Sequence, residues 1–119
     1  MIDEYLRFRN GFAEAMDPRF YTIQYIDHLY LDGRAKMFSS ENAAILAEIK
    51  IYPTNAKAVH GLYATGKLDE IVNVLIPQAE EWGRANGCEH AFIDSREAWQ
   101  RILKPAGFDT YKVALIKEL

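Results

Sequence analysis

The chain has 119 residues, of which 50% are hydrophobic and 13% aromatic, so one domain spanning residues 1–119 is expected and a disordered chain is excluded. A formal net charge of −3, without a run of lysines or arginines, disfavours a protein that binds nucleic acid through its phosphates. One cysteine, Cys88, and three scattered histidines exclude an internal disulfide and predict no metal site.

The sequence also argues against a membrane or secreted protein. No apolar stretch approaches the roughly 18 residues that cross a bilayer. The acidic, amphipathic start, MIDEYLRFRN, differs from a signal peptide. We therefore expect a soluble intracellular protein whose cysteine is reduced.

The first two predicted elements are helices. Apolar residues recur at helical spacing over residues 2–16, and Asp17-Pro18 ends that run. A second, shorter helix begins near Ile23, has its apolar residues on one face and stops at Gly33.

Three predicted strands follow, because the apolar period changes from helical to alternating. They are AKMF at 35–38, AAILAEIKIY at 43–52 and AKAVHGLYA at 56–64. Alternation in the second strand divides its residues between two faces: Ile45, Ala47, Ile49 and Ile51 against Leu46, Glu48, Lys50 and Tyr52. The turns SSEN and PTN are too short for a crossover, so the three strands are antiparallel. Gly61 indicates a bulge or a close backbone approach.

The strongest predicted helix runs from Gly66 to Gly87. Its apolar stripe comprises Leu68, Ile71, Val72, Leu75, Ala79 and Trp82. Pro77 lacks an N–H and clashes with the preceding turn, so we expect it to kink or divide this helix.

The remaining elements are a strand CEHAFID at 88–94, a short helix REAWQRILK at 96–104 and a final strand FDTYKVALIKEL at 108–119. The strand–helix–strand passage over residues 56–94 is long enough for a right-handed parallel crossover. The predicted order is ααβββαβαβ, in an α/β fold with a mixed sheet and helices on its faces.

This order resembles the GNAT acyl-CoA N-acyltransferase fold without its usual first strand. EEWGRANGCEHAFID resembles the GNAT helix on the pyrophosphate side running into the next strand. REAWQRILKPAGF resembles the following helix, which ends at a Gly-Phe pair, here Gly107-Phe108. Together with AEIKIYP and ATGKLDEI, these segments resemble small GNAT-like proteins of tailed phages and prophages. The resemblance covers residues 20–119 and implies acetyl-CoA or CoA as cofactor if the protein is an enzyme.

The resemblance also implies a pyrophosphate loop of the form Arg/Gln-x-x-Gly-x-Gly/Ala at the helix start. In this chain Tyr63 stands at the first position, Gly66 at the first glycine and Leu68 at the second. One position of three matches, and the acidic Asp69 and Glu70 that follow compete with a bound anion. We therefore expect a degraded cradle, in which Gly66 is a turn residue.

The alternative is a working cradle made by Gly66, Lys67 and Leu68, with Lys67 on a phosphate. Arg96, at the end of the fourth strand, is a further candidate for a phosphate or carboxylate, because open α/β sheets bind ligands at strand ends. The other interpretation of Arg96 is an ion pair with Asp94 or Glu97.

Catalysis by a GNAT enzyme implies a base for the amine and often a tyrosine that protonates the CoA thiolate. At the tyrosine's spacing, four residues before the Gly-Phe pair, this chain has Leu103. Glu48 is the first candidate base, since it stands in an otherwise apolar strand. Its other interpretation is an exposed residue paired with Lys50 or a cross-strand neighbour. His60 and Tyr63 are candidates on the strand before the cradle, although the sequence favours a partly buried, hydrogen-bonded structural histidine over a catalytic one at His60.

Two functions follow from these residues. The first is a non-catalytic phage protein with a degenerate CoA site, acting as a structural or host-interaction module in the host cytoplasm or the virion. The alternative is an acetyl-CoA-dependent N-acetyltransferase that modifies an amine. We expect a protein partner, from phage or host, or self-association through the terminal strand YKVALIKEL.

Overall fold

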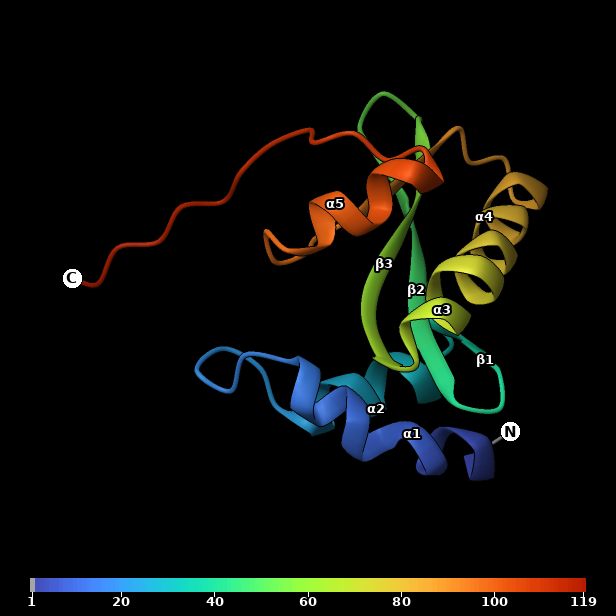
Figure 1. The fold of residues 1–119 in the computed structure, drawn as a ribbon, viewed down its shortest axis with the longest axis vertical. Helices are drawn as coiled ribbons and strands as arrows, with labels where there is room; N and C mark the ends of the chain where they lie inside the picture. Colours follow the sequence, from blue (N-terminus) through green and yellow to red (C-terminus); the bar gives the residue numbers. More distant parts are fainter. Residues whose placement is uncertain (1) are drawn as a thin grey trace.

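The computed structural model describes residues 2–119, in which two helices precede a sheet and further helices follow it (Figure 1). The elements are α1 (Ile2–Ala15), α2 (Ile23–Leu31), β1 (Lys36–Ser39), β2 (Ala43–Ile51), β3 (Lys57–Gly66), α3 (Leu68–Glu70), the π-helical η1 (Ile71–Leu75), α4 (Ile76–Ala85), β4 (His90–Ile93), α5 (Trp99–Leu103) and the 3-10 turn η2 (Lys104–Ala106). Among these residues no helix combines the length and the apolar character that crossing a bilayer requires.

The sheet has the order β1-β2-β3-β4. β1, β2 and β3 are antiparallel neighbours, as their short turns predict, and β4 runs parallel to β3. The parallel pair is possible because the long passage through α3, η1 and α4 separates the two strands in sequence. The predicted mixed sheet and its crossover are confirmed.

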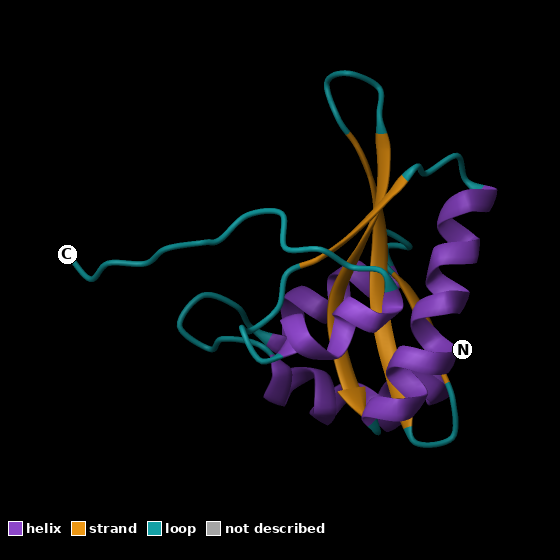
Figure 2. Cartoon of the chain, turned by 45° about the horizontal axis from the view of Figure 1, so that its top comes forward, coloured by secondary structure: helices purple, strands orange, loops and turns teal. Residues whose placement is uncertain are grey.

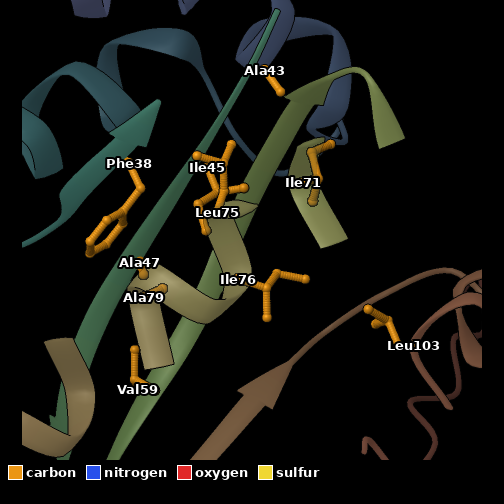
Figure 3. Packing of buried hydrophobic residues seen from close by; sticks show 10 residues of the cluster. All are labelled: Phe38, Ala43, Ile45, Ala47, Val59, Ile71, Leu75, Ile76, Ala79 and Leu103. Atoms are coloured by element: carbon orange, nitrogen blue, oxygen red, sulfur yellow. The ribbon is translucent and has the colours of Figure 1, made fainter. Parts of the chain in front are cut away.

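Each face of the sheet packs against a different group of helices (Figure 2). The crossover core joins the sheet to η1, α4 and α5 and comprises Phe38, Ala43, Ile45, Ala47, Val59, Ile71, Leu75, Ile76, Ala79 and Leu103 (Figure 3). The N-terminal core joins the opposite face to α1 and α2 and comprises Tyr5, Phe12, Ile26, Leu29, Ala35, Ala44 and Leu46. Neighbours in β2 therefore enter opposite cores, which confirms the predicted alternation of Ile45 and Ala47 against Leu46.

The long helix after β3 changes its hydrogen-bond pattern just before its proline. An α-helical turn, α3, passes into η1, and α4 then begins with Pro77 in its first turn. Proline has no N–H for the bond to the residue four positions before it, so the wider π turn lies directly before Pro77. The helix predicted to be kinked or divided by Pro77 is thus continuous over residues 68–85 with a π turn inside it, and Ile71, Leu75 and Ala79 still enter the crossover core.

The predicted final strand is wrong. Residues 109–119 form an extended, exposed segment that belongs to no sheet in the described chain (Figures 1 and 2). The chain turns at Gly107 (φ 94°), and the N–H of Phe108 bonds the carbonyl of Leu103 at 3.2 Å. Beyond that point the segment leaves the body. A strand needs an adjacent edge, and alternation in the sequence does not specify which edge supplies it.

Candidate functional site

β4 pairs with β3 over its whole length, and β3 then continues without it. Their register runs from Ala58 opposite His90 to Gly61 opposite Ile93, where β4 ends. A Cβ on Gly61 would lie 3.3 Å from Cγ1 of Ile93, which explains the small residue at the last pair. We call the rest of β3, Leu62–Gly66, the diverging segment. Within the described sheet it pairs with β2 alone.

A bulge accompanies this change of pairing. Leu46 of β2 faces Tyr63, whereas the next residue, Ala47, faces Gly61, so Leu62 is an extra residue in β3. Bulges bend the strand that contains them and redirect its side chains. The bulge at Leu62 therefore lies where β3 leaves β4, and it confirms the irregularity predicted at Gly61.

The diverging segment leads directly into a helix start. Gly66 adopts a φ of 103°, and Lys67 donates its N–H to the carbonyl of Asn42 at 2.9 Å. Lys67 occupies the N-cap position without a side-chain cap, and the N–H of Ile71 makes the first helical bond, to the carbonyl of Lys67 at 3.1 Å. The N–H groups of residues 68–70 therefore precede the intrahelical ladder, which is the position from which helix starts bind anions.

The two carboxylates of the first helical turn differ. Glu70 accepts hydrogen bonds from Ser40 Oγ at 2.6 Å, from Asn42 N at 3.0 Å and from Asn42 Nδ2 at 3.2 Å. The bond from Ser40 is the main reason that the pKa of Glu70 lies below its ordinary value. Asp69 is exposed. Glu70 thus anchors the helix start to the β1–β2 turn, a role that helix charge alone did not predict.

The predicted phosphate-binding residues do not all lie together. Gly66, Lys67 and Leu68 are consecutive at the helix start, where the side chain of Leu68 is 42% exposed. Arg96 is exposed in the loop after β4. Hydrogen bonds to Arg19 are the main cause of the lowered pKa of Asp17, and the charge of Arg96 lowers it further. The charge of Arg96 thus acts across the distance to the α1–α2 loop, and no ion pair joins Arg96 to Asp94 or Glu97 in the described chain.

Two of the three predicted catalytic residues are direct neighbours. Glu48 in β2 is the cross-strand partner of His60 in β3. Tyr52 Oη lies 2.6 Å from Nε2 of His60, whose ring stacks on Phe92 with centroids 5.1 Å apart. Burial lowers the pKa of His60, and the nearby charge of Lys50 lowers it further, so the ring is neutral at pH 7.

Tyr63 is placed differently. It lies in the diverging segment at the margin of the N-terminal core. Burial raises its pKa, and Tyr21 and Tyr25 raise it further. The phenol is therefore protonated at neutral pH, which suits a hydrogen-bond donor, and the catalytic role suggested for Tyr63 stays a prediction.

Comparisons with known proteins find similar solved structures but no similar sequence. No protein-family model matches the sequence, and no curated protein matches it. Solved structures do match. Glucosamine-6-phosphate N-acetyltransferase from Arabidopsis thaliana gives a TM-score of 0.72 at 12% identity, with 98% of this chain and 92% of that chain covered. The aminoglycoside 6'-N-acetyltransferase of Acinetobacter haemolyticus gives 0.68 at 18% identity over 99% and 92% of the two chains.

A third match, an aminoglycoside N-acetyltransferase in complex with CoA, gives a TM-score of 0.69 at 14% identity, with 100% of this chain and 96% of that chain covered. The chain has the GNAT fold. Identities between 12% and 18% show that fold and carry no activity with them.

Leu103 and Cys88 both lie at the crossover core. Leu103, at the spacing of the GNAT tyrosine, is buried in the crossover core, so this position supplies no phenol. Cys88 is half-buried beside the same core.

Sequence reasoning missed Tyr52 as a site residue. The alternation of β2 put it on the face of Glu48, which was a usable signal. Its hydrogen bond to His60 depends on how the turn over residues 53–56 brings β3 back against β2, which alternation does not specify.

Proposed function

We propose that the protein is an acetyl-CoA-dependent N-acyltransferase that acetylates an amine. The observation that carries the proposal is the extension of β3 beyond the end of β4, followed at once by an uncapped helix start at Lys67. The free edge of the diverging segment suits an extended, amide-containing chain such as the pantetheine arm, because such a chain hydrogen-bonds like an added strand. The N–H groups of residues 68–70 suit the pyrophosphate. The acetyltransferases that share the fold, one of them solved with CoA, support the same assignment.

Acetyl-CoA supplies the acetyl group as a thioester, whose carbonyl carbon the amine attacks as the carbon–sulfur bond breaks. This chain has to accept a proton from the amine. His60 suits that task because its ring is neutral, and Tyr52 orients the ring through Nε2. Glu48 stands beside it and stabilises the imidazolium by charge. Tyr63 stays protonated, so its phenol can act as a hydrogen-bond donor to a ligand along the diverging segment.

Ligand binding tests the proposal first. A ligand present at about a hundred times its Kd adds about 2.7 kcal/mol to the free energy of unfolding. We expect acetyl-CoA and CoA to raise the thermal midpoint and to give a saturable heat in calorimetry, whereas adenosine alone serves as the control. An unchanged midpoint at millimolar CoA contradicts the proposal.

Turnover with a panel of amines tests the catalytic assignments. His60→Gln and Tyr52→Phe should lower kcat while CoA still binds, and His28→Gln, an exposed histidine of α2, is the matched control. Glu48→Gln and Tyr63→Phe are measured in the same way, and unchanged turnover removes either residue from the mechanism. Because the pKa of His60 lies below the ordinary 6.5, activity should be lost only as the pH falls below 6.5.

The second candidate function, a non-catalytic module of phage origin, stays a prediction, as do its host-cytoplasmic or virion location and its protein partner. The observation that favours it is the buried Leu103, which leaves the usual proton-donor position apolar. Failure to bind CoA, with the protein folded, is the result expected of it.

A further inference from the structure

The helices on the His60 side of the sheet cover only part of that face. α1 and α2 pack there against Ala44 and Leu46 of the N-terminal core, at the end of the strands away from the β2–β3 turn (Figure 1). Further along the strands, Glu48, His60 and Phe92 form one row across β2, β3 and β4, since His60 is the register partner of both other residues. We call the part of this face beyond the N-terminal core the open face.

Aromatic rings line the open face. The ring of Phe92 contacts the ring of His60, with centroids 5.1 Å apart, and the ring of Tyr111, with centroids 5.5 Å apart. Tyr52 adds a third ring, whose centroid lies 6.4 Å from that of Phe92. Rings of this kind pack favourably against an apolar or aromatic group of a ligand.

Charges of both signs surround His60. Burial is the main cause of its lowered pKa; the charges of Lys50 and Lys112 lower the pKa further, whereas Glu48 and Asp94 oppose the shift. Within the part of the chain that the structure describes, no ion pair joins any of these four charged residues to another group. Two cations and two carboxylates therefore remain available to a ligand beside the ring.

One of the two lysines comes from residues 109–119, which we call the tail. Tyr111 of the tail contacts Phe92, and Glu118 pairs with Arg19 of the α1–α2 loop at 3.3 Å, so the tail runs from β4 to that loop. Lys112 follows Tyr111 directly, with its ammonium 5.9 Å from the centroid of that ring. The tail thus brings a positive charge into range of His60.

We propose that the acceptor is the α-amino group of a free amino acid with an apolar or aromatic side chain, bound on the open face. The inference rests on the proposed N-acyltransferase function and names its acceptor. The amino group lies at His60, which accepts its proton, and Glu48 attracts the ammonium form by charge. The carboxylate of the amino acid pairs with Lys50 and Lys112, because lysine ammonium groups form charge-assisted hydrogen bonds with carboxylates.

The same surface disfavours other amines. The side chain of the amino acid packs against Phe92 and Tyr111, where a strongly polar group would lose its contacts with water. A polyamine would bring a second positive charge against Lys50 and Lys112, and like charges repel. An amine without a carboxylate would leave both lysines unpaired.

Acetyl transfer to L-phenylalanine and to phenethylamine, which has the same ring and no carboxylate, tests the inference. At pH 8 the double variant Lys50→Met with Lys112→Met should lower kcat/KM for L-phenylalanine by at least about tenfold and leave kcat/KM for phenethylamine unchanged. Each amine is compared with itself, so the different basicities of the two amines cancel, and His60 is neutral at this pH in both proteins. Lys36→Met, at an exposed lysine of β1, is the matched control and should change neither value. Equal losses for both amines, or no loss for either, overturn the inference.

A second variant tests the contact with the side chain of the amino acid. Tyr111 is 75% exposed, so Tyr111→Ser removes a ring without opening a core. It should reduce the preference for L-phenylalanine over L-alanine, as measured by the ratio of the two kcat/KM values. An unchanged ratio overturns the assignment of the rings.

Binding without acetyl-CoA separates this inference from the function on which it rests. The imidazole NMR signals of His60, assigned with His60→Gln, should shift saturably on addition of L-phenylalanine, while those of His28 on α2 stay unchanged. A shift with no acetyl transfer to any amine contradicts the proposed function and keeps the amino-acid site. Transfer to phenethylamine or spermidine, with no shift on adding L-phenylalanine, overturns the inference and leaves the proposed function in place.

Discussion

Gly66 shows how one residue can match a ligand motif for reasons of folding. Its φ of 103° is left-handed, and a Cβ there would lie 2.1 Å from the carbonyl oxygen of Asn42 and 2.5 Å from Cα of Ala43. The β1–β2 turn therefore requires glycine at this position, whether or not a phosphate binds beyond it. The turn interpretation of Gly66 is sufficient to explain the residue, and the CoA proposal rests on the N–H groups that follow it.

A substitution separates these two demands. Gly66→Ala should lower the free energy of unfolding by more than the roughly 1–3 kcal/mol that a strained backbone conformation costs alone, because the new Cβ also meets backbone atoms of the β1–β2 turn. Gly33→Ala is the matched control, since Gly33 has a φ of 74° with nothing within 4 Å of its Cβ position. Denaturant unfolding of both variants makes the comparison. Equal losses of unfolding free energy in the two variants would show that the contact with Asn42 does not contribute to stability.

At the scale of elements, α1 and α2 are joined by a cluster of hydrogen bonds to Asp27 beside the N-terminal core. Asp27 of α2 accepts a hydrogen bond from Tyr5 Oη at 2.6 Å and two from Arg9, at 2.9 Å and 2.8 Å. The guanidinium of Arg9 is the main cause of the lowered pKa of Asp27, and burial is the main cause of the raised pKa of Tyr5. The geometry is bidentate, which is the stronger arrangement for an arginine and a carboxylate.

We expect Asp27→Asn to lower the free energy of unfolding by about 1–3 kcal/mol at pH 7, since Tyr5 and Arg9 lose their charged acceptor. A lowered carboxyl pKa stabilises the folded chain above the ordinary value of 3.8, and this stabilisation is lost as the pH falls from 3.8 through the lowered pKa. The variant should therefore lose less stability than the parent over that range. Unfolding curves at neutral and acid pH measure both effects, with Asp32→Asn, an exposed aspartate at the α2 C-cap, as the control. An equal loss of stability on acidification in Asp27→Asn and in the parent would contradict the assignment of this pH dependence to Asp27.

The elements themselves could largely be predicted from the sequence, because the hydrophobic periodicity and the residues that break helices and strands act locally. Helical spacing predicted α1 and α2, and alternation predicted β2 with its two faces. Pro77 predicted the irregularity in the helix before α4. The final strand could not be predicted correctly, because whether the tail pairs depends on an edge and not on its own pattern.

The candidate site was only partly predictable for a related reason. Alternation and a short turn suffice to place Glu48 beside His60. The bond between Glu70 and Ser40 and the effect of the Arg96 charge on Asp17 join segments far apart in sequence, and they follow only from the packed fold.

At the scale of the whole molecule, the sheet separates two cores that share no buried residue. Leu75 is fully buried in the crossover core, and Ile26 is fully buried in the N-terminal core on the opposite face. β2 contributes alternate residues to each core, so each core can lose a side chain without opening the other. Substitutions at sites without shared partners usually have additive effects on stability.

We therefore expect Leu75→Ala and Ile26→Ala each to lower the free energy of unfolding by about 2–5 kcal/mol through the cavity that each leaves. The double variant should lose the sum of the two to within about 0.5 kcal/mol. Leu75→Ala with Ile45→Ala is the comparison pair, because both residues belong to the crossover core (Figure 3), and their combined loss should depart from the sum. Equilibrium unfolding in denaturant gives all the values. A loss of free energy in Leu75→Ala with Ile26→Ala that departs from the sum would mean that the sheet transmits the collapse of one core to the other. The diverging segment adjoins both cores, so its geometry would then be sensitive to packing on either face.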